Sequence, residues 1–205
     1  SLSARKSAND MQYLATYGLN WVARSNLAHG TFTLADAGNH FTIGTALTDQ
    51  SANAATGWNG RSLTKAGAGT LVLTGNNTYS GGTHIASGTL QVGDGGSSGA
   101  IAGDVVTQGT LAFNRGDTFT FSGNISGNGA VRQMGAGTTI LAGTNRYTGG
   151  TTIDSGILRA GNVGAFAAGT AYTINGGMLD LNDYDLTVSS LAANGGQVAL
   201  GRAAL

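Results

Sequence analysis

One stretch of sequence occurs twice in this chain, and this repetition limits the possible folds more than any other feature. Residues 63–93 read LTKAGAGTLVLTGNNTYSGGTHIASGTLQVG, and residues 131–161 read VRQMGAGTTILAGTNRYTGGTTIDSGILRAG. More than half of the aligned positions are identical. A period longer than one hairpin, with glycine at constant positions, is typical of stacked repeat architectures. The chain is therefore predicted to be a length of solenoid.

The similarity between the two copies continues beyond this stretch. Residues 106–113 (VTQGTLAF) align with residues 174–181 (INGGMLDL) at the same offset. We expect one continuous solenoid in four segments: an irregular lead-in or tail at 1–18, divergent first coils with a polar loop at 19–62, a first repeat copy at 63–130, and a second, truncated copy at 131–205.

Short runs with an apolar residue at every second position predict strands. We expect strands at 19–24, 30–35, 40–44, 70–74, 83–86, 89–92, 104–107, 110–113, 118–121, 130–133, 138–142, 151–154, 157–160, 171–175, 178–181, 185–188 and 197–200. The alternation predicts that Ile85, Leu90, Val92, Leu111, Phe113, Phe119, Phe121, Ile153, Leu158, Ala160, Leu179, Leu181, Leu186 and Val188 point inward. The outward positions are mostly Thr, Ser, Gln and Asn.

Strands this short, repeated at this period, favour an all-β parallel β-helix over a sandwich. Three coils of about 22 residues would fill one repeat, each coil adding one strand to each sheet. The whole chain would then form roughly nine coils, stacked at about 4.8 Å into a rod about 40 Å long. Glycine suits the corners of such coils, because it tolerates positive φ.

Composition excludes several classes of function. The chain has ten basic and ten acidic residues, so it offers no electrostatic basis for binding nucleic acid or an anionic membrane. It has no cysteine, which excludes disulfides and thiolate metal sites. We find no apolar run long enough to span a bilayer and no signal-peptide pattern. If the protein is exported, its address is expected outside this sequence.

The pattern GAGTLxLTGxNxYxGGTxIxxGTLxxG resembles the autotransporter-associated β-strand repeat of Gram-negative type V secreted proteins. It begins at Gly67 in the first copy and recurs from Gly135 as GAGTTILAGTNRYTGGTTIDSGILRAG. Two linked copies carry the resemblance, which extends over about residues 19–200. The structural repeat positions are Gly67, Gly69, Gly75, Asn77, Tyr79, Gly81 and Gly82, with Gly135, Gly137, Gly143, Asn145, Tyr147, Gly149 and Gly150.

The resemblance implies a right-handed parallel β-helix displayed on the bacterial cell surface, as in adhesins and self-aggregating proteins. It implies contacts with a host surface or with identical rods, and an outer-membrane β-barrel in the same polypeptide outside this segment. Apart from the resemblance, the poor inventory of acidic residues leads us to expect no enzymatic activity, and we expect no cofactor. Within such passengers, a segment can also act as an intramolecular folding module that assists secretion, which is the alternative function.

Three groups of residues are candidates for chemical sites. Asp180, Asp183 and Asp185 are the nearest approach to the acidic cluster of a polysaccharide-active enzyme, but aspartate is also common in turns. Residues 93–97 (GDGGS) only partly match a calcium-binding glycine loop. His29, His40 and His84 share no ligand spacing and are interpreted as surface residues. We therefore predict no catalytic, cofactor or metal site.

The remaining candidates are interpreted as scaffold or surface. Asn77 and Asn145 are expected at corners, where asparagine tolerates the left-handed conformation, with Tyr79 and Tyr147 packed over them. Trp21 and Trp58 are expected in the core or at an end cap, with a contact role as the alternative. Arg132, Arg146 and Arg159 form either a weak basic stripe for glycans or a neighbouring rod, or a solvated face. The uncapped last coil, residues 197–200, predicts end-to-end association.

Overall fold

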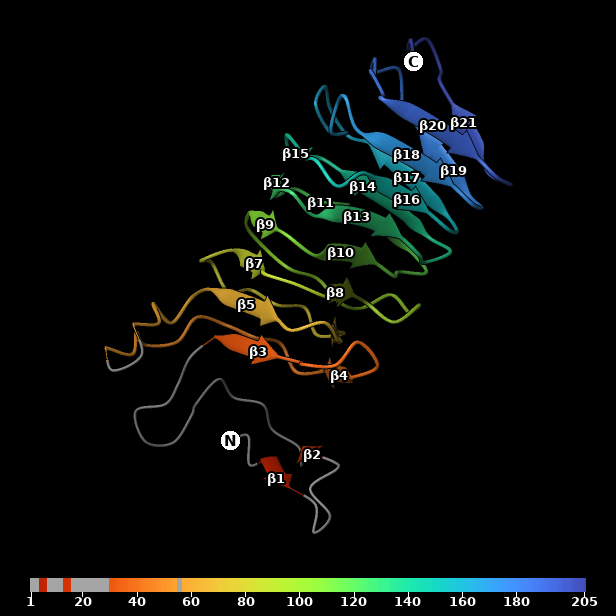
Figure 1. The fold of residues 1–205 in the computed structure, drawn as a ribbon. Helices are drawn as coiled ribbons and strands as arrows, with labels where there is room; N and C mark the ends of the chain where they lie inside the picture. The colour runs from red at the N-terminus through yellow and green to blue at the C-terminus, as the bar shows by residue number, and fades with distance from the viewer. Residues whose placement is uncertain (1–3, 7–12, 16–29, 55–56) are drawn as a thin grey trace.

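The computed structural model describes residues 4–6, 13–15, 30–54 and 57–205. The described residues contain no helix, and thus none long and apolar enough to cross a membrane. Figure 1 shows the strands from β3 onward as successive coils, stacked from orange to blue along one axis. The predicted strand at 19–24, with Trp21 and His29, lies outside the described residues.

Three parallel sheets run along this stack. The first coils add strands to the six- and eight-stranded sheets, the middle coils to all three sheets, and the last coils to the eight- and five-stranded sheets. The eight-stranded sheet contains β4 (His40–Ile43), β6 (Thr70–Leu73), β8 (Thr89–Val92), β10 (Thr110–Phe113), β13 (Ala130–Gln133), β16 (Thr151–Ile153), β18 (Ala171–Ile174) and β20 (Ser190–Ala193). The five-stranded sheet contains β11 (Thr118–Phe121), β14 (Thr138–Leu141), β17 (Ile157–Ala160), β19 (Met178–Asp180) and β21 (Gln197–Ala199). The six-stranded sheet contains β3 (Thr31–Thr33), β5 (Leu63–Ala66), β7 (Thr83–Ile85), β9 (Val105–Thr107), β12 (Ile125–Gly127) and β15 (Arg146–Tyr147).

The predicted all-β parallel solenoid is confirmed, but its coils are shorter and fewer than expected. The starting positions of β6, β8, β10 and β13 in the eight-stranded sheet are 70, 89, 110 and 130, so each coil is slightly shorter than predicted. The step from β4 to β6 is longer, because residues 48–54 and 57–60 extend outside the coil (Figure 1). The chain therefore makes about seven turns rather than nine. A separate antiparallel pair, β1 (Ala4–Lys6) with β2 (Tyr13–Ala15), precedes them.

The repeat does not correspond to a whole number of coils. Strand β13 lies three coils after β6 in the same sheet, but β13 is not the sequence counterpart of β6. That counterpart is the next strand along the chain, β14, which belongs to the five-stranded sheet. Likewise β7 of the six-stranded sheet corresponds to β16 of the eight-stranded sheet. The second copy is therefore displaced by one face of the solenoid.

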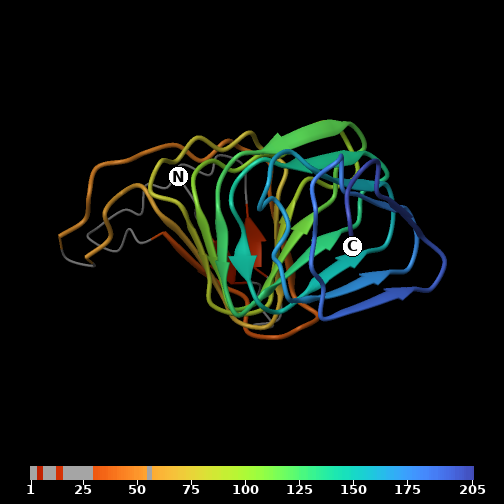
Figure 2. The ribbon, with the colours of Figure 1, turned by 90° about the horizontal axis from the view of Figure 1, so that it is seen from above.

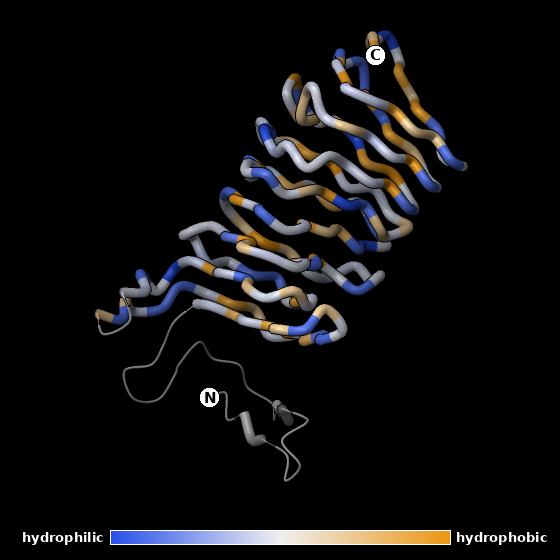
Figure 3. The backbone as a smooth tube through the Cα atoms, in the orientation of Figure 1, coloured by the Kyte–Doolittle hydropathy of each residue, from blue (hydrophilic) through white to orange (hydrophobic). Residues whose placement is uncertain are grey.

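The core is a set of columns in which one inward residue stacks on the next. Leu71 pairs in register with Leu90, Leu90 with Leu111, and Leu111 with Val131, and all four are fully buried. Figure 3 shows the apolar positions recurring from coil to coil, and Figure 2 shows the coils superposed in the view from above. Each buried aliphatic side chain contributes about 1.5–3 kcal/mol. The predicted inward residues lie in this core, with Phe119 and Val188 packed at its margin.

One predicted strand is wrong, and six short strands were not predicted. Residues 185–188 form no strand, because Asn182 (φ 48°) and Asp183 (φ 68°) turn the chain after β19. Leu186 nevertheless points inward and is 6% exposed. The strands that were not predicted are β5, β12, β15 and β20, together with β1 and β2 in the segment 1–18 that was expected to be irregular.

Candidate functional site

The two repeat tyrosines are internal residues rather than corner covers. Tyr79 and Tyr147 are both 0% exposed. The hydroxyl of Tyr79 lies 2.6 Å from that of Thr83, and the hydroxyl of Tyr147 lies 2.7 Å from that of Thr151. Burial raises the pKa of both phenols, so they remain protonated at any physiological pH. These residues support the coil and offer nothing to a ligand.

The repeat asparagines link three consecutive coils. Asn77 Oδ1 accepts a bond from the Leu47 amide (2.8 Å), and its Nδ2 donates to the Ala100 carbonyl (2.7 Å). Asn145 makes the same two bonds, to the preceding and following coils, at 2.7 and 2.5 Å. The prediction of a left-handed conformation is wrong, because only residues 182–183 have positive φ among the described non-glycine residues. The amide side chain acts by bridging coils.

The repeat glycines divide into two groups. Gly67, Gly82 and Gly150 have φ between 76° and 86°, a region that disfavours side chains. At the other positions, a Cβ would lie 2.1 to 2.8 Å from backbone of the neighbouring coil, too close for any side chain; these are Gly69, Gly75, Gly81, Gly135, Gly137, Gly143 and Gly149. Coil-to-coil packing is thus the second reason for glycine in the repeat.

A buried lysine caps one corner, and the sequence analysis did not single it out. Lys65 points inward from β5 and is 0% exposed. Its ammonium donates to the carbonyls of Ala66 (2.9 Å), Gly67 (2.8 Å) and Ser87 (3.1 Å). Desolvation lowers its pKa. At the corresponding position of the second copy, Gln133 is also fully buried and donates to two corner carbonyls, at 2.8 and 3.4 Å.

The three candidate acidic residues have separate structural partners. Asp180 pairs with Arg159 at 2.7 Å. Asp183 accepts the amide of Arg202, and Asp185 accepts the amide of Ala204, both at 2.7 Å. Within the part of the chain that the structure describes, no three acidic or histidine side chains gather as a metal site would require.

The loop that partly matches a calcium motif accepts hydrogen bonds from an arginine side chain. The guanidinium of Arg115 donates to the carbonyls of Ser97 (2.7 Å) and Gly99 (2.6 Å), and it pairs with Asp117 at 2.8 Å. The hydrogen bond from Arg115 holds the pKa of Asp117 below its usual value. Two carbonyls of this loop, at Ser97 and Gly99, therefore face a cation that the chain itself supplies.

The three candidate arginines do not form a stripe. Arg132 extends from the eight-stranded sheet, Arg146 from the six-stranded sheet and Arg159 from the five-stranded sheet. Arg132 pairs with Asp154 at 2.5 Å, and Arg159 pairs with Asp180. The basic stripe is therefore wrong: the three side chains face different directions, and two of them are neutralised.

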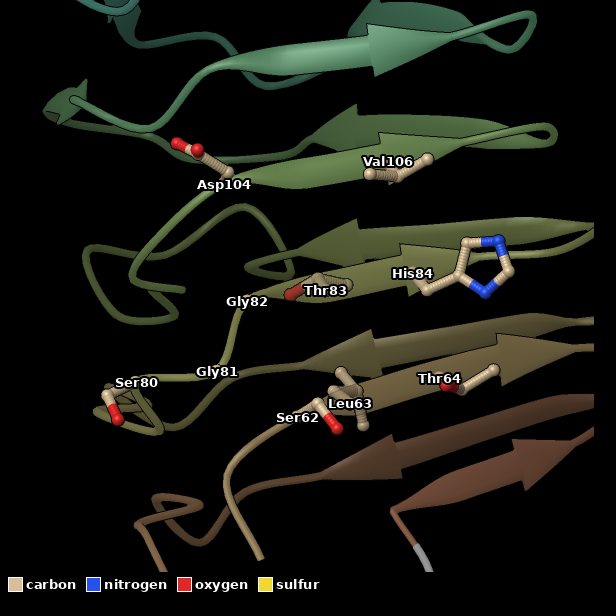
Figure 4. A pocket seen from close by; sticks show the side chains of 10 residues that line it. All are labelled: Ser62, Leu63, Thr64, Ser80, Gly81, Gly82, Thr83, His84, Asp104 and Val106. Atoms are coloured by element: carbon tan, nitrogen blue, oxygen red, sulfur yellow. The ribbon is translucent and has the colours of Figure 1, made fainter. Parts of the chain in front are cut away.

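The outer face of the six-stranded sheet carries a shallow hollow of about 430 Å³. Figure 4 shows it over β5, β7 and β9, where Gly81 and Gly82 contribute no side chain. His84 and Val106 are register neighbours on this face, and Asp104 lies two residues before Val106. His40, by contrast, begins β4 in the eight-stranded sheet. The hollow has polar hydroxyls, one imidazole, one carboxylate and an exposed valine around it, but no catalytic pairing.

Comparison with known proteins agrees with this architecture. Residues 63–92 and 131–160 match the model of a family described as the passenger-associated-transport-repeat. The resemblance to autotransporter passengers with repeats is confirmed. The chain is 48% identical, over 93 residues, to the adhesin BmaC autotransporter of Brucella suis biovar 1 (strain 1330). The aligned part covers 43% of this chain and 3% of that protein. No solved structure matches the chain.

Proposed function

We propose that this chain is a non-enzymatic, surface-displayed segment of an autotransporter adhesin that mediates contact with a host surface or with identical molecules. Three features support the proposal: the solenoid, the two passenger-associated repeats and the likeness to a protein named as an adhesin. The chain spans only 3% of that relative, so the role concerns this segment alone. Localisation outside a Gram-negative cell is part of the same proposal.

The outer face of the six-stranded sheet is the proposed contact surface. It carries the hollow beside Gly81 and Gly82, together with Val106, which is 46% exposed. The arginines that extend from the other two sheets are paired with aspartates of adjacent coils, whereas Arg146 on this face has no carboxylate partner in the described part of the chain. A face with unpaired charge, hydroxyls and exposed aliphatic surface has the mixed character of a protein contact site.

A second candidate is an intramolecular folding module that assists secretion of the passenger. The family description, which contains the word transport, favours it. The inter-coil bonds of Asn77 and Asn145 also suit a segment on which further coils are laid down. A glycan-active enzyme is disfavoured, because Asp180, Asp183 and Asp185 have separate structural partners.

The experiment uses bacteria that display the full-length protein containing this segment. A His84→Glu/Val106→Glu variant alters neighbouring outward positions of the six-stranded sheet, and Thr152→Glu/Thr173→Glu is the matched control on the eight-stranded sheet. We expect the first variant to reduce adherence to cultured epithelial cells or sedimentation of the bacteria, with display unchanged. If the two variants change adherence and sedimentation to the same extent, the proposed contact surface is refuted.

Deletion of residues 63–205 separates the two candidates. Loss of adherence with normal surface display supports the contact role, whereas loss of display supports the folding module. Cleavage of any polysaccharide by the purified chain would contradict both.

A further inference from the structure

The sequence contains the acceptor pattern of N-linked glycosylation, Asn-X-Ser/Thr, at residues 76–78 (NNT) and at residues 124–126 (NIS). In this modification a sugar is attached to the side-chain nitrogen of the asparagine, and the hydroxyl residue two positions later is part of the recognised pattern. A pattern this short also occurs by chance, so the surroundings of each asparagine decide whether it can carry a sugar. The two sites differ in these surroundings.

Asn76 presents its carboxamide on the outside of the solenoid. It lies between β6 and β7, where exposed and buried residues alternate: Asn76 and Thr78 are exposed, and Asn77 between them is buried. Alternate residues of an extended segment point to the same side, so the Asn76 carboxamide and the Thr78 hydroxyl share one outer surface. Within residues 30–54 and 57–205, no hydrogen bond involves either side chain. The acceptor nitrogen is therefore accessible in the folded chain.

The coils on either side of Asn76 leave room for an attached sugar. In the following coil, Ala100 forms a parallel bridge with Asn76. In the preceding coil, the Leu47 carbonyl accepts the Thr78 amide, which places Ala46 alongside Asn76. Both neighbours end at a methyl group. A sugar on the Asn76 nitrogen would project into solvent without displacing a side-chain contact.

Asn124 is also exposed, but its carboxamide is held between two coils. Its Nδ2 donates to the Asp104 carboxylate (3.1 Å), and its Oδ1 accepts the Thr144 amide (2.7 Å). A sugar on Nδ2 would compete with the bond to Asp104. Turning the carboxamide outward would take away the acceptor of the Thr144 amide, which is costly for a backbone donor between coils.

We propose that Asn76 is the N-linked glycosylation site of this chain and that Asn124 is not modified. The co-substrate is a nucleotide-activated sugar: the Asn76 nitrogen forms a bond to the anomeric carbon and loses one proton, and the nucleoside diphosphate leaves. In the second copy, Thr144 and Arg146 replace Asn76 and Thr78, so the repeat itself does not require the pattern. The inference does not rest on the proposed contact surface, because Asn76 does not line the hollow.

Mass spectrometry of the protein recovered from the bacterium that produces it tests the proposal. Trypsin cleaves after Lys65, Arg115 and Arg132, so the two patterns fall on separate peptides, residues 66–115 and residues 116–132. We expect the first peptide to carry the additional mass of a sugar and the second peptide to have the mass of its amino acids alone.

Substitutions assign the sugar to one residue. Asn76→Gln and Thr78→Val should each remove the additional mass from the first peptide, whereas Thr78→Ser keeps the hydroxyl and should retain it. Asn124→Gln is the matched control in the other pattern and should leave the modification of the first peptide unchanged. A first peptide without a sugar would overturn the proposal. A sugar that persists in Asn76→Gln would overturn it as well, because it would then be attached to a serine or threonine.

The choice between the two asparagines has its own tests. A sugar on the second peptide would contradict the assignment to Asn76 alone. Thermal denaturation of the unmodified chain checks the physical basis of that choice. Asn76→Gln should melt at the same temperature as the wild type, and Asn124→Gln should melt at a lower one, because only Asn124 bonds to neighbouring coils through its side chain. Equal melting temperatures of the two variants would overturn this basis.

Discussion

Tyr79 and Tyr147 occupy the same position of the repeated sequence and lie on different sides of the solenoid. Tyr79 precedes β7 of the six-stranded sheet, whereas Tyr147 precedes β16 of the eight-stranded sheet. Both keep the same internal bond to the threonine that opens the following strand. The repeat therefore encodes a strand, a corner and a strand that can be built into any side of the coil. Its outward residues are presented in a new direction in the second copy.

Removing the hydroxyl of Tyr79 should destabilise the solenoid. Tyr79→Phe keeps the ring in the core and leaves the Thr83 hydroxyl without its partner. We expect a loss of about 1–3 kcal/mol in the free energy of unfolding, measured by urea denaturation. Tyr184→Phe, on a partly exposed ring, is the control and should change it by less than about 0.5 kcal/mol. Equal losses in the two variants would contradict a specific role for the buried bond.

Adding one methyl group at Gly137 should disturb the stacking of coils. Its Cβ would lie 2.1 Å from the Asp117 carbonyl oxygen, so the two coils must separate. We expect Gly137→Ala to reduce the free energy of unfolding by about 1–3 kcal/mol. Gly38→Ala is the control, because a Cβ there meets no atom within 4 Å. A Gly137→Ala chain as stable as the control would show that the coils adapt without cost.

Lys65 should stabilise its corner through the three carbonyls that it contacts. Lys65→Met removes its bonds to all three carbonyls; those of Ala66 and Gly67 keep the Leu34 amide and the Ser87 hydroxyl as donors, so the change should cost about 1–3 kcal/mol. Lys65→Gln places there the residue that the second copy carries at Gln133, and it should cost less. Thermal denaturation ranks the wild type, Lys65→Gln and Lys65→Met by stability. A Lys65→Met variant as stable as the wild type would refute the capping role.

The stability contributed by Lys65 should depend on alkaline pH. Its folded-state pKa is below the ordinary value of 10.5, so the unfolded chain binds this proton more readily. Stability therefore rises with pH between the lowered folded pKa and the ordinary one. We expect the wild type to gain stability relative to Lys65→Gln as the pH rises towards 10.5, and the titration of tyrosines cancels because both proteins carry the same ones. A constant difference across that range would contradict the shift.

Acid should weaken the Arg115 corner. The hydrogen bond from Arg115 lowers the folded-state pKa of Asp117 below its ordinary 3.8. The pair therefore contributes its stability above pH 3.8, and this contribution is lost as the pH falls through the lower folded-state pKa. Unfolding titrations between about pH 5 and about pH 2 should show a smaller acid loss for Asp117→Asn than for the wild type. If the wild type and Asp117→Asn lose the same stability in acid, the Arg115–Asp117 pair does not make this contribution.

Part of the candidate site was accessible from the sequence, and part was not. Comparison of the copies identified the shared glycine, asparagine and tyrosine positions, and it assigned His84 to the outside. It did not identify Lys65 as an internal residue, because a charged side chain is normally exposed unless its donors are satisfied. Three backbone carbonyls satisfy them here, and those carbonyls converge only after the corner and the next coil have formed.

The sequence by itself determined the local structure of this protein: alternating apolar residues specify short strands, and the recurring glycines specify corners and close coil contacts. Only the tertiary structure decided the coil length and the face that each residue occupies. Coils stack by the register of their backbone hydrogen bonds, so the length of each turn is set by its neighbours and not by the period of the sequence. Arg132, Arg146 and Arg159 all lie in the second copy, but β13, β15 and β17 belong to three different sheets, so the three side chains point in three directions and Arg146 alone is left unpaired among them.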